Sequence, residues 1–280
     1  AETERLVAQR AVCAEVQSIA LRYIAVTGRH GPAAARNLGW RAAHGTLIAF
    51  TDDDCIPAPD WLRAGVNAFA EGVTGVAGKI LVPLPTTPTD YERNVAQLAH
   101  AEFVTANCFY HRDALAAVGG FDERFRVAWR EDSDLNFRLI QLGARLIHAE
   151  TAVVTHPARL APWGISLRQQ RKSQYNALLY KKHPALYRQQ IQAAPPWRYY
   201  ATVGALGVTL LGVLRRRRTL TLAGAALWLW LTAAFCRRRL RGTSHRPEHV
   251  AEMALTSALI PPLAIYWRLR GALRYRVWFW

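Results

Sequence analysis

The stretch "TLIAFTDDDCIPAPDWL", residues 46–62, joins a short apolar run directly to three consecutive aspartates. The run Leu47–Phe50 is typical of a buried core strand in a parallel sheet. Asp52, Asp53 and Asp54 then stand at its carboxyl end, which is where open α/β sheets bind their ligands. Because like charges at this spacing repel one another, we expect something positively charged to join these aspartates.

A divalent cation is the functional interpretation of the triplet. Hard cations take carboxylate oxygens and often share them with a substrate diphosphate. Mg²⁺ or Mn²⁺ would neutralise both the aspartates and a leaving phosphate group. The alternative is a solvated turn whose aspartates cap the helix expected from about Pro59. That alternative accounts for one aspartate but not for three.

A second acidic pair, Glu131-Asp132, lies in "FDERFRVAWREDSDLNFRLIQLG", residues 121–143. The pair follows a Gly-Gly turn and precedes an amphipathic helix, which suits a carboxylate that projects into a cleft. Such a carboxylate, near a metal-bound leaving group, could deprotonate an acceptor hydroxyl. Alternatively, Asp132 and Asp134 only cap the helix and favour its positive N-terminus.

The first 198 residues alternate between helical and strand patterns. Helices are expected at 4–19, 32–44, 59–70, 91–100 and 131–143, and strands at 21–26, 47–50, 72–84, 102–111 and 144–156. Strands interleaved with helices indicate an α/β domain. The four cysteines are widely spaced and form no CxxC pair, which argues against a zinc site or a disulfide framework and fits a reducing compartment.

Most of the formal net charge of +16 belongs to the C-terminal part of the chain. Residues 199–280 contain thirteen arginines against two glutamates, a net of +11 that leaves +5 for residues 1–198. A basic chain of this kind could bind nucleic acid. The arginines of the tail, however, punctuate apolar runs and do not line a polar face, so the pattern favours a membrane over nucleic acid as the partner.

A boundary is expected near residues 193–200, between a domain at 1–198 and a membrane-associated helical tail at 199–280. Three uncharged apolar runs follow the boundary, at 199–214, 219–236 and 253–267. Flanking arginine clusters and interfacial aromatic residues favour membrane association. Each run is shorter than the roughly 20 residues that span a bilayer comfortably, so a buried helical hairpin, or helices lying partly in the interface, are the alternatives.

The segments "GPAAARNLGWRAAHGTLIAFTDDDCIPAPDWL" and "GGFDERF…EDSDLNFRLIQLGARLIH" together resemble family 2 glycosyltransferases of the GT-A type. The resemblance runs through about residue 156 and weakens through residue 198. It implies a Rossmann-like α/β fold and inverting transfer of a sugar from a nucleotide sugar, with Mg²⁺ or Mn²⁺ held by the D-x-D motif. On that pattern Asp52, with Asp53 beside it, would lie near the bound nucleotide sugar, Asp52 and Asp54 would hold the metal, and Asp132, supported by Glu131, would be the general base.

Three further positions each have two interpretations. His156, which ends the strand "AVVTH", could complete the metal shell or be an uncommitted histidine at a strand end. Arg36, in "AARN", could approach the nucleotide sugar or be an ordinary surface arginine. Arg171 lies where relatives carry a Q-x-x-R-W motif, although Arg168 and Lys172 replace its glutamine and tryptophan here. A basic helix could face the diphosphate, or it could simply be a solvated face.

Family members usually begin with a strand–helix–strand unit whose aspartate holds the nucleotide base. This chain begins with "AETERLVAQRAV", so the resemblance implies an N-terminally incomplete domain with an exposed sheet edge.

Two functions follow from these patterns. The first is a glycosyltransferase at the cytoplasmic (inner) membrane that acts on a lipid-linked or cell-envelope glycan acceptor. Its catalytic domain would face the cytoplasm, because the family's nucleotide sugars are cytosolic. The second is a non-catalytic, membrane-anchored module that binds a sugar or a nucleotide. A phosphoryl-transfer enzyme is disfavoured because the chain has no Gly-rich phosphate loop with a lysine.

Overall fold

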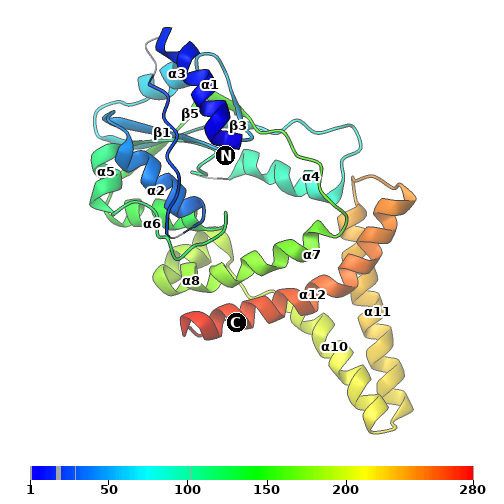
Figure 1. The fold of residues 1–280 in the computed structure, drawn as a ribbon. Helices are drawn as coiled ribbons and strands as arrows, with labels where there is room; N and C mark the ends of the chain where they lie inside the picture. The colour runs from blue at the N-terminus through cyan, green and yellow to red at the C-terminus, as the bar shows by residue number, and fades with distance from the viewer. Residues whose placement is uncertain (1, 17–19, 29, 102, 280) are drawn as a thin grey trace.

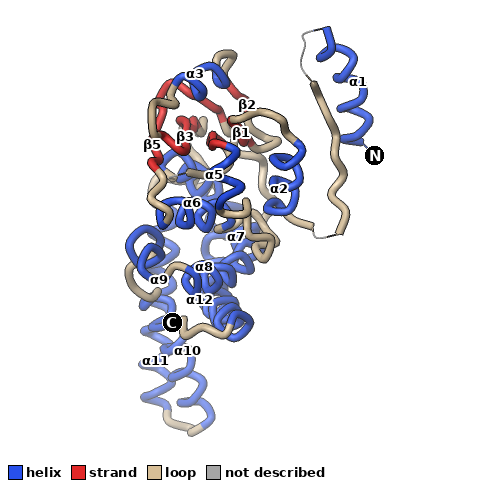
Figure 2. The backbone as a smooth tube through the Cα atoms, turned by 90° about the vertical axis from the view of Figure 1, so that its left-hand side faces the viewer, coloured by secondary structure: helices blue, strands red, loops and turns tan. Residues whose placement is uncertain are grey.

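A computed structural model of the protein describes residues 2–16, 20–28, 30–101 and 103–279, without the side chains of 11–16. A sheet covered by helices lies above a group of C-terminal helices, from which one helical hairpin projects (Figure 1). The N-terminal helix α1 (Glu2–Val16) lies to one side of the sheet domain and is joined to it by an extended segment (Figure 2).

The sheet has five strands in the order β1-β4-β3-β5-β2. Their bounds are β1 Leu47–Thr51, β2 Ile56–Pro57, β3 Val73–Leu81, β4 Asn107–His111 and β5 Arg145–Thr155. The central pair β3–β5 is parallel, whereas β1–β4, β3–β4 and β2–β5 are antiparallel. The domain is therefore α/β with a mixed sheet, and the acidic turn after β1 lies at a sheet edge.

Two expectations about strands are wrong. β1 is not a parallel core strand, because it is an edge strand that pairs antiparallel with β4. Ile48 and Phe50 are buried on one face of β1, and Ala49 packs on the other. An apolar run of this kind indicates that a strand is buried, but it does not indicate whether the strand is parallel or antiparallel to its neighbour. Residues 21–26 form no strand, since this segment pairs with no strand in the described part of the chain and Leu21 is 42% exposed.

The helices expected around the sheet are present. Their bounds are α2 Pro32–Ala42, α3 Trp61–Asn67, α4 Asp90–Val95 with its continuation η1 Ala96–His100, α5 Arg112–Ala117 and α6 Glu131–Gln141. Gly31 precedes α2 with a φ of 131°, and a Cβ there would lie 2.9 Å from the carbonyl oxygen of Arg126. Only glycine fits this entry into α2.

Both faces of the sheet are covered by apolar side chains. On one face, Trp40 of α2, Phe50 of β1 and Leu135 of α6 share a core with the strand β4. On the other face, Trp61 of α3 packs with Val154 of β5. Because α2 and α6 share the first core, their amino-terminal regions are held near the end of β1.

The remaining elements form the lower part of the molecule in Figure 1. They are α7 Ile165–Gln169, η2 Gln170–Ser173, α8 Gln174–Lys182, α9 Pro184–Leu186, η3 Tyr187–Ile191, α10 Trp197–Leu214, α11 Arg218–Leu240 and α12 Pro247–Tyr275. The chain returns to the sheet domain along α12. A Cβ at Gly271 would lie 2.4 Å from the carbonyl oxygen of Gln174, and Phe279 packs between Tyr180 and Tyr187. The end of the chain thus shares a core with α8.

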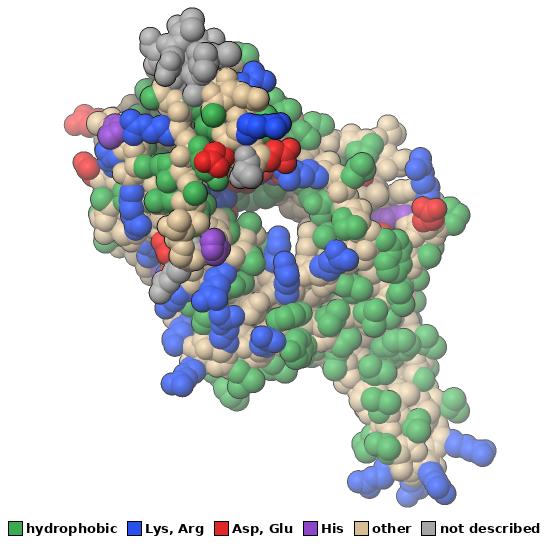
Figure 3. Space-filling view, in the orientation of Figure 1, with side chains coloured by type: hydrophobic (Ala, Val, Ile, Leu, Met, Phe, Trp, Pro, Cys, Tyr) green, Lys and Arg blue, Asp and Glu red, His purple; other side chains and the backbone are tan. Residues whose placement is uncertain are grey.

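Helices α10 and α11 form the projecting hairpin. A Cβ at Gly212 would lie 2.5 Å from the amide nitrogen of Thr221, and one at Gly224 would lie 2.7 Å from that of Thr209. Such close approach at small residues is characteristic of helix pairs in membranes. The outer surface of the hairpin is apolar, with basic side chains gathered at its tip (Figure 3). By length and composition, α11 and α12 are the described helices that could cross a membrane.

Candidate active site

Arg36 brings together the two acidic motifs, although they lie far apart in the sequence. It projects from α2 and pairs with Asp52 at 2.8 Å and with Glu131 at 2.7 Å. Burial by itself would lower the pKa of Arg36, but the two carboxylates outweigh burial and raise it. Three of the expected site residues therefore form one cluster, and Arg36 is not a free surface arginine.

The other two aspartates of the triplet point away from Arg36. Asp53 is exposed over 92% of its side chain and contacts Arg159 at 3.4 Å. Oδ2 of Asp54 forms an ion pair with Nε of Arg159 at 3.0 Å, and Oδ1 of Asp54 lies 3.5 Å from Nε2 of His156. The triplet thus spreads its carboxylates toward a buried arginine, toward solvent and toward the end of β5.

The site contains a group of side chains that fits a divalent cation. Asp54, Cys55 and His156 can place one ligand atom each within 4.8 Å of one another. The Nδ1 atom of His156 is buried without a hydrogen-bond partner. Carboxylate and imidazole suit Mn²⁺, whereas thiols prefer softer metals, and burial raises the pKa of the Cys55 thiol. Asp54 and His156 are therefore the fitting ligands, while Asp52, the other expected ligand, is committed to Arg36.

Glu131 and Asp132 occupy the first turn of α6; Glu131 is buried, and Asp132 is partly buried. Burial raises the pKa of Glu131 to about 7; the charge of Asp132 adds to this effect and Arg36 opposes it. Burial also raises the pKa of Asp132, against a hydrogen bond of 2.7 Å that its Oδ1 accepts from the backbone N–H of Ser133. A carboxyl group with a pKa of about 7 can exchange protons near neutral pH, and the pKa of its neighbour Asp132 is raised in the same direction.

The backbone before this pair is in an unusual conformation. Arg130 has a φ of 75°, in the left-handed region that non-glycine residues seldom adopt. Its Nε donates to Oδ1 of Asn176 on α8 at 2.9 Å, and its guanidinium lies 4.5 Å from the ring centre of Trp129. Such conformations cost about 1–3 kcal/mol and cluster at functional sites. The contact with α8 maintains this turn and so aims Glu131 and Asp132.

Sequence patterns missed three residues near the site and indicated a fourth, Lys172, only as part of a basic helix. Cys55 and Arg159 border Asp54, Arg130 precedes the acidic pair, and Lys172 lies near Glu131, whose charge opposes the lowering of its pKa by burial. Arg171 is exposed, and none of its side-chain contacts in the described part of the chain reaches an acidic residue of the site. Of these residues, Lys172 alone had a sequence signal, which is its position in the Q-x-x-R-W segment.

The chain is similar to known glycosyltransferases over about half of its length. Residues 3–119 match the family model described as "Glycosyl transferase family 2". A pre-mycofactocin glycosyltransferase of Mycobacterium tuberculosis is 33% identical over 145 residues, which cover 46% of this chain and 30% of that protein. The glycosyltransferase AglE of Haloferax volcanii is 30% identical over 156 residues, which cover 51% of this chain and 49% of that protein. The chain thus spans about a third to a half of these relatives.

Solved structures with related folds include two sugar transferases. A mannosyltransferase of Pyrobaculum calidifontis, in complex with GDP-Man and Mn²⁺, superposes with a TM-score of 0.47 at 20% identity, covering 96% of this chain and 73% of that one. GalNAc-T7, with UDP, GalNAc and Mn²⁺, has a TM-score of 0.44 at 15% identity, covering 69% and 43%. The family match and the curated relatives support a family 2 glycosyltransferase domain in the α/β sheet-bearing part of this chain.

Proposed function

We propose that this protein is a metal-dependent, inverting glycosyltransferase that uses a nucleotide sugar and glycosylates a lipid-linked or envelope-glycan acceptor at the membrane. The observation that carries the proposal is Arg36, which holds Asp52 and Glu131 on either side of one guanidinium. The aspartate motif and the buried acidic pair therefore border one site, where a nucleotide sugar and an acceptor hydroxyl could meet.

Each cluster has a role in a single displacement. Asp54 and His156 would hold Mg²⁺ or Mn²⁺, which supplies positive charge for the departing diphosphate. Asp132 accepts the proton of the acceptor hydroxyl while that oxygen bonds to the anomeric carbon and the bond to the nucleotide breaks. Glu131 and Arg36 position Asp132 relative to Asp52. Attack opposite the leaving group inverts the anomeric centre.

The hairpin α10–α11 supports a location at the membrane. Leu222 and Trp230 of α11 are 70% and 66% exposed, so the hairpin presents apolar side chains that the described protein does not cover. The apolar part of α11, residues 219–236, has a helical length of about 27 Å, close to the roughly 30 Å of a hydrocarbon core. Both ends of the hairpin lie beside the sheet domain, so one side of the membrane would carry the active site (Figure 1).

Donor screening tests the catalytic part of the proposal. The purified protein is incubated with a panel of nucleotide sugars and release of the free nucleotide is measured with Mn²⁺, with Mg²⁺ and with a chelator. We expect release with one or a few nucleotide sugars that requires the divalent cation. Tight binding of a nucleotide sugar without any release or transfer would support the non-catalytic binding module instead.

Membrane extraction tests the location. Salt screens charge attraction, but it does not weaken the burial of apolar side chains in lipid. We therefore expect the protein to stay with membranes washed in high salt or in carbonate. Quantitative release into the soluble fraction would contradict insertion of the hairpin and leave only attachment through arginine charge.

A further inference from the structure

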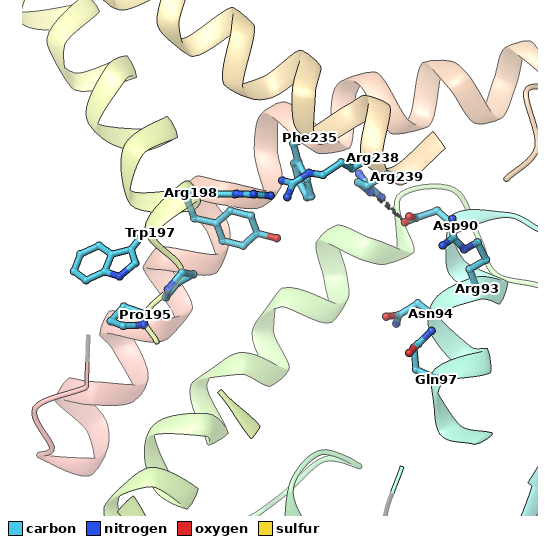
Figure 4. Close-up of a pocket in the computed structure, with 12 residues that line it drawn as sticks. Asp90, Arg93, Asn94, Gln97, Pro195, Trp197, Arg198, Phe235, Arg238 and Arg239 are labelled. Carbon is cyan, nitrogen blue, oxygen red and sulfur yellow. Dashed lines mark hydrogen bonds and ion pairs between the residues drawn. The ribbon is translucent and has the colours of Figure 1, made fainter. Parts of the chain in front are cut away.

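The base of the hairpin α10–α11 faces α4 and η1 across a groove of about 700 Å³. Trp197, Arg198, Phe235 and Arg238 lie on the hairpin side, and Arg93, Asn94 and Gln97 lie on the α4 side (Figure 4). We call this the basal groove. It lies where the apolar surface of the hairpin meets the sheet domain, which is the level expected for lipid headgroups if the hairpin is inserted.

The basal groove carries uncompensated positive charge. Four arginines line it against one acidic residue, Asp90. Asp90 is already paired with Arg239, at 2.8 and 3.1 Å, as the dashed line in Figure 4 marks. In the ranges that the structure describes, Arg93, Arg198 and Arg238 have no carboxylate partner; Arg93 donates to the backbone carbonyl of Arg241 and Arg238 lies over Phe235. The groove thus offers three guanidinium groups to an anion.

The basal groove adjoins a second cavity on the side of the aspartate motif. Asp90 and Arg239 line the groove and also line this second, smaller cavity of about 110 Å³. Arg159 lines that smaller cavity and pairs with Asp53 and Asp54. An acceptor whose charged end is held in the groove would therefore extend toward the metal site.

We propose that the basal groove binds the diphosphate that joins a membrane lipid to its sugar acceptor. Three guanidinium groups without a carboxylate partner in the described residues match a headgroup with two or three negative charges better than a phosphodiester with one, because arginine forms bidentate hydrogen bonds to phosphate oxygens. The apolar surface of α10 and α11 begins at the basal groove, so it can contact the hydrocarbon chain of the lipid. This inference rests on the proposed function and assigns the acceptor site within it.

The test compares two double variants of the full-length protein in detergent. Arg198→Gln with Arg238→Gln removes two charges from the groove, whereas Arg215→Gln with Arg217→Gln removes two charges from the hairpin tip. Native mass spectrometry with a long-chain polyprenyl diphosphate gives the dissociation constant for each protein. We expect the groove variant to bind about tenfold more weakly or worse, and the tip variant to change by less than about twofold.

Two comparison ligands identify the part of the lipid that is recognised. Phosphatidylglycerol supplies a phosphodiester on a lipid, and inorganic pyrophosphate supplies the anion without a lipid. We expect both to bind more weakly than polyprenyl diphosphate. Equal binding of phosphatidylglycerol would overturn the preference for a headgroup with more than one negative charge. Equal binding of pyrophosphate would overturn the role of the lipid chain in binding. An unchanged affinity in the groove variant, or an equal loss in the tip variant, would overturn the site itself.

A separate measurement distinguishes failure of this inference from failure of the proposed function. Metal-dependent binding of a nucleotide sugar should be the same in the groove variant as in the wild type, which also shows that the variant folds. If nucleotide-sugar binding is intact but the groove variant still binds polyprenyl diphosphate normally, only the groove assignment is wrong. If the wild type binds no nucleotide sugar, the proposed function is wrong.

Discussion

The two acidic motifs of the site use the same side-chain chemistry in opposite environments. Asp53 and Asp54 follow a sheet-edge strand, and Asp53 is almost fully solvated. Glu131 is buried with only 3% of its side chain exposed, and burial raises the pKa of both members of the Glu131-Asp132 pair. Carboxylates at an accessible sheet edge suit a cation, whereas a buried carboxyl group with a raised pKa suits proton transfer. The comparison teaches that burial, more than residue type, separates the two roles.

Replacing Asp132 should have the largest effect and would test the buried half of the comparison. Asp132→Asn keeps the size and much of the hydrogen bonding but cannot accept a proton. A positioned general base contributes about 10²–10⁴-fold, so turnover should fall by around that factor while nucleotide-sugar affinity stays nearly constant. Steady-state kinetics and calorimetric binding measure the two quantities. Normal turnover would place the base elsewhere.

Replacing Asp54 tests the other half of the comparison, the acidic motif at the sheet edge. Asp54→Ala removes a charged oxygen ligand from the group that fits a divalent cation. Loss of groups that only support a ligand already costs about 10–100-fold in metal affinity, so Mn²⁺-dependent affinity for the nucleotide sugar should fall at least that far. Asp53→Ala is the matched control, because its carboxylate points to solvent. An unchanged metal dependence in Asp54→Ala would remove this residue from the site.

The pH dependence of activity should sharpen the contrast. A base with a raised pKa must lose its proton before it can act, so kcat/KM should fall as the pH drops, with an apparent pKa above the 3.8 of an ordinary aspartate. Arg36, Arg130 and Asp132 are the charged neighbours that face Glu131 or share its environment. Glu131, whose pKa is raised to about 7, is the member of the pair that titrates near neutral pH. Glu131→Gln removes that titration, so the acid limb should move to lower pH.

The shift caused by Glu131→Gln should change activity a few-fold near pH 6, far less than the loss of Asp132 itself. The pH–rate profiles of the wild type, of Glu131→Gln and of the exposed control Glu150→Gln provide the measurement. A profile that moves to higher pH, or one that the control moves equally, would contradict a direct influence of Glu131 on the base.

The smallest effect is expected at Arg159. Its guanidinium pairs with Asp53 and Asp54 and so competes with a cation for their oxygens. Exposed ion pairs contribute about 0.2–1 kcal/mol, so Arg159→Gln should tighten Mn²⁺ binding by about fivefold at most. Titration of Mn²⁺ by electron paramagnetic resonance measures this, with Arg124→Gln, another exposed arginine paired with an aspartate, as the control. Weaker Mn²⁺ binding in Arg159→Gln would mean that Arg159 supports the metal ligands.

Much of the local structure could be predicted because it depends on neighbouring residues. The helix entry at Gly31–Pro32, the strand before Asp52 and the amphipathic helix after Glu131 were all confirmed within a few residues. The prediction of a strand at 21–26 was wrong for a non-local reason, since an apolar run becomes a strand only if another strand pairs with it. The predicted parallel direction of β1 was wrong for the same kind of reason. Both faces of β1 are covered by apolar side chains, and this burial does not depend on the direction of the neighbouring strand.

The sequence by itself determined which residues could carry the chemistry: two acidic motifs, their order along the chain, and an apolar tail divided by arginines. Those features are composition and local periodicity, which need no knowledge of partners. Only the tertiary structure decided that Arg36 bridges residues 16 and 95 positions away, that Arg159 and His156 face Asp54, and that Glu131 is buried. Burial and long-range pairing depend on which distant segments pack together, and that packing sets the pKa values and the free charges on which the site and the basal groove depend.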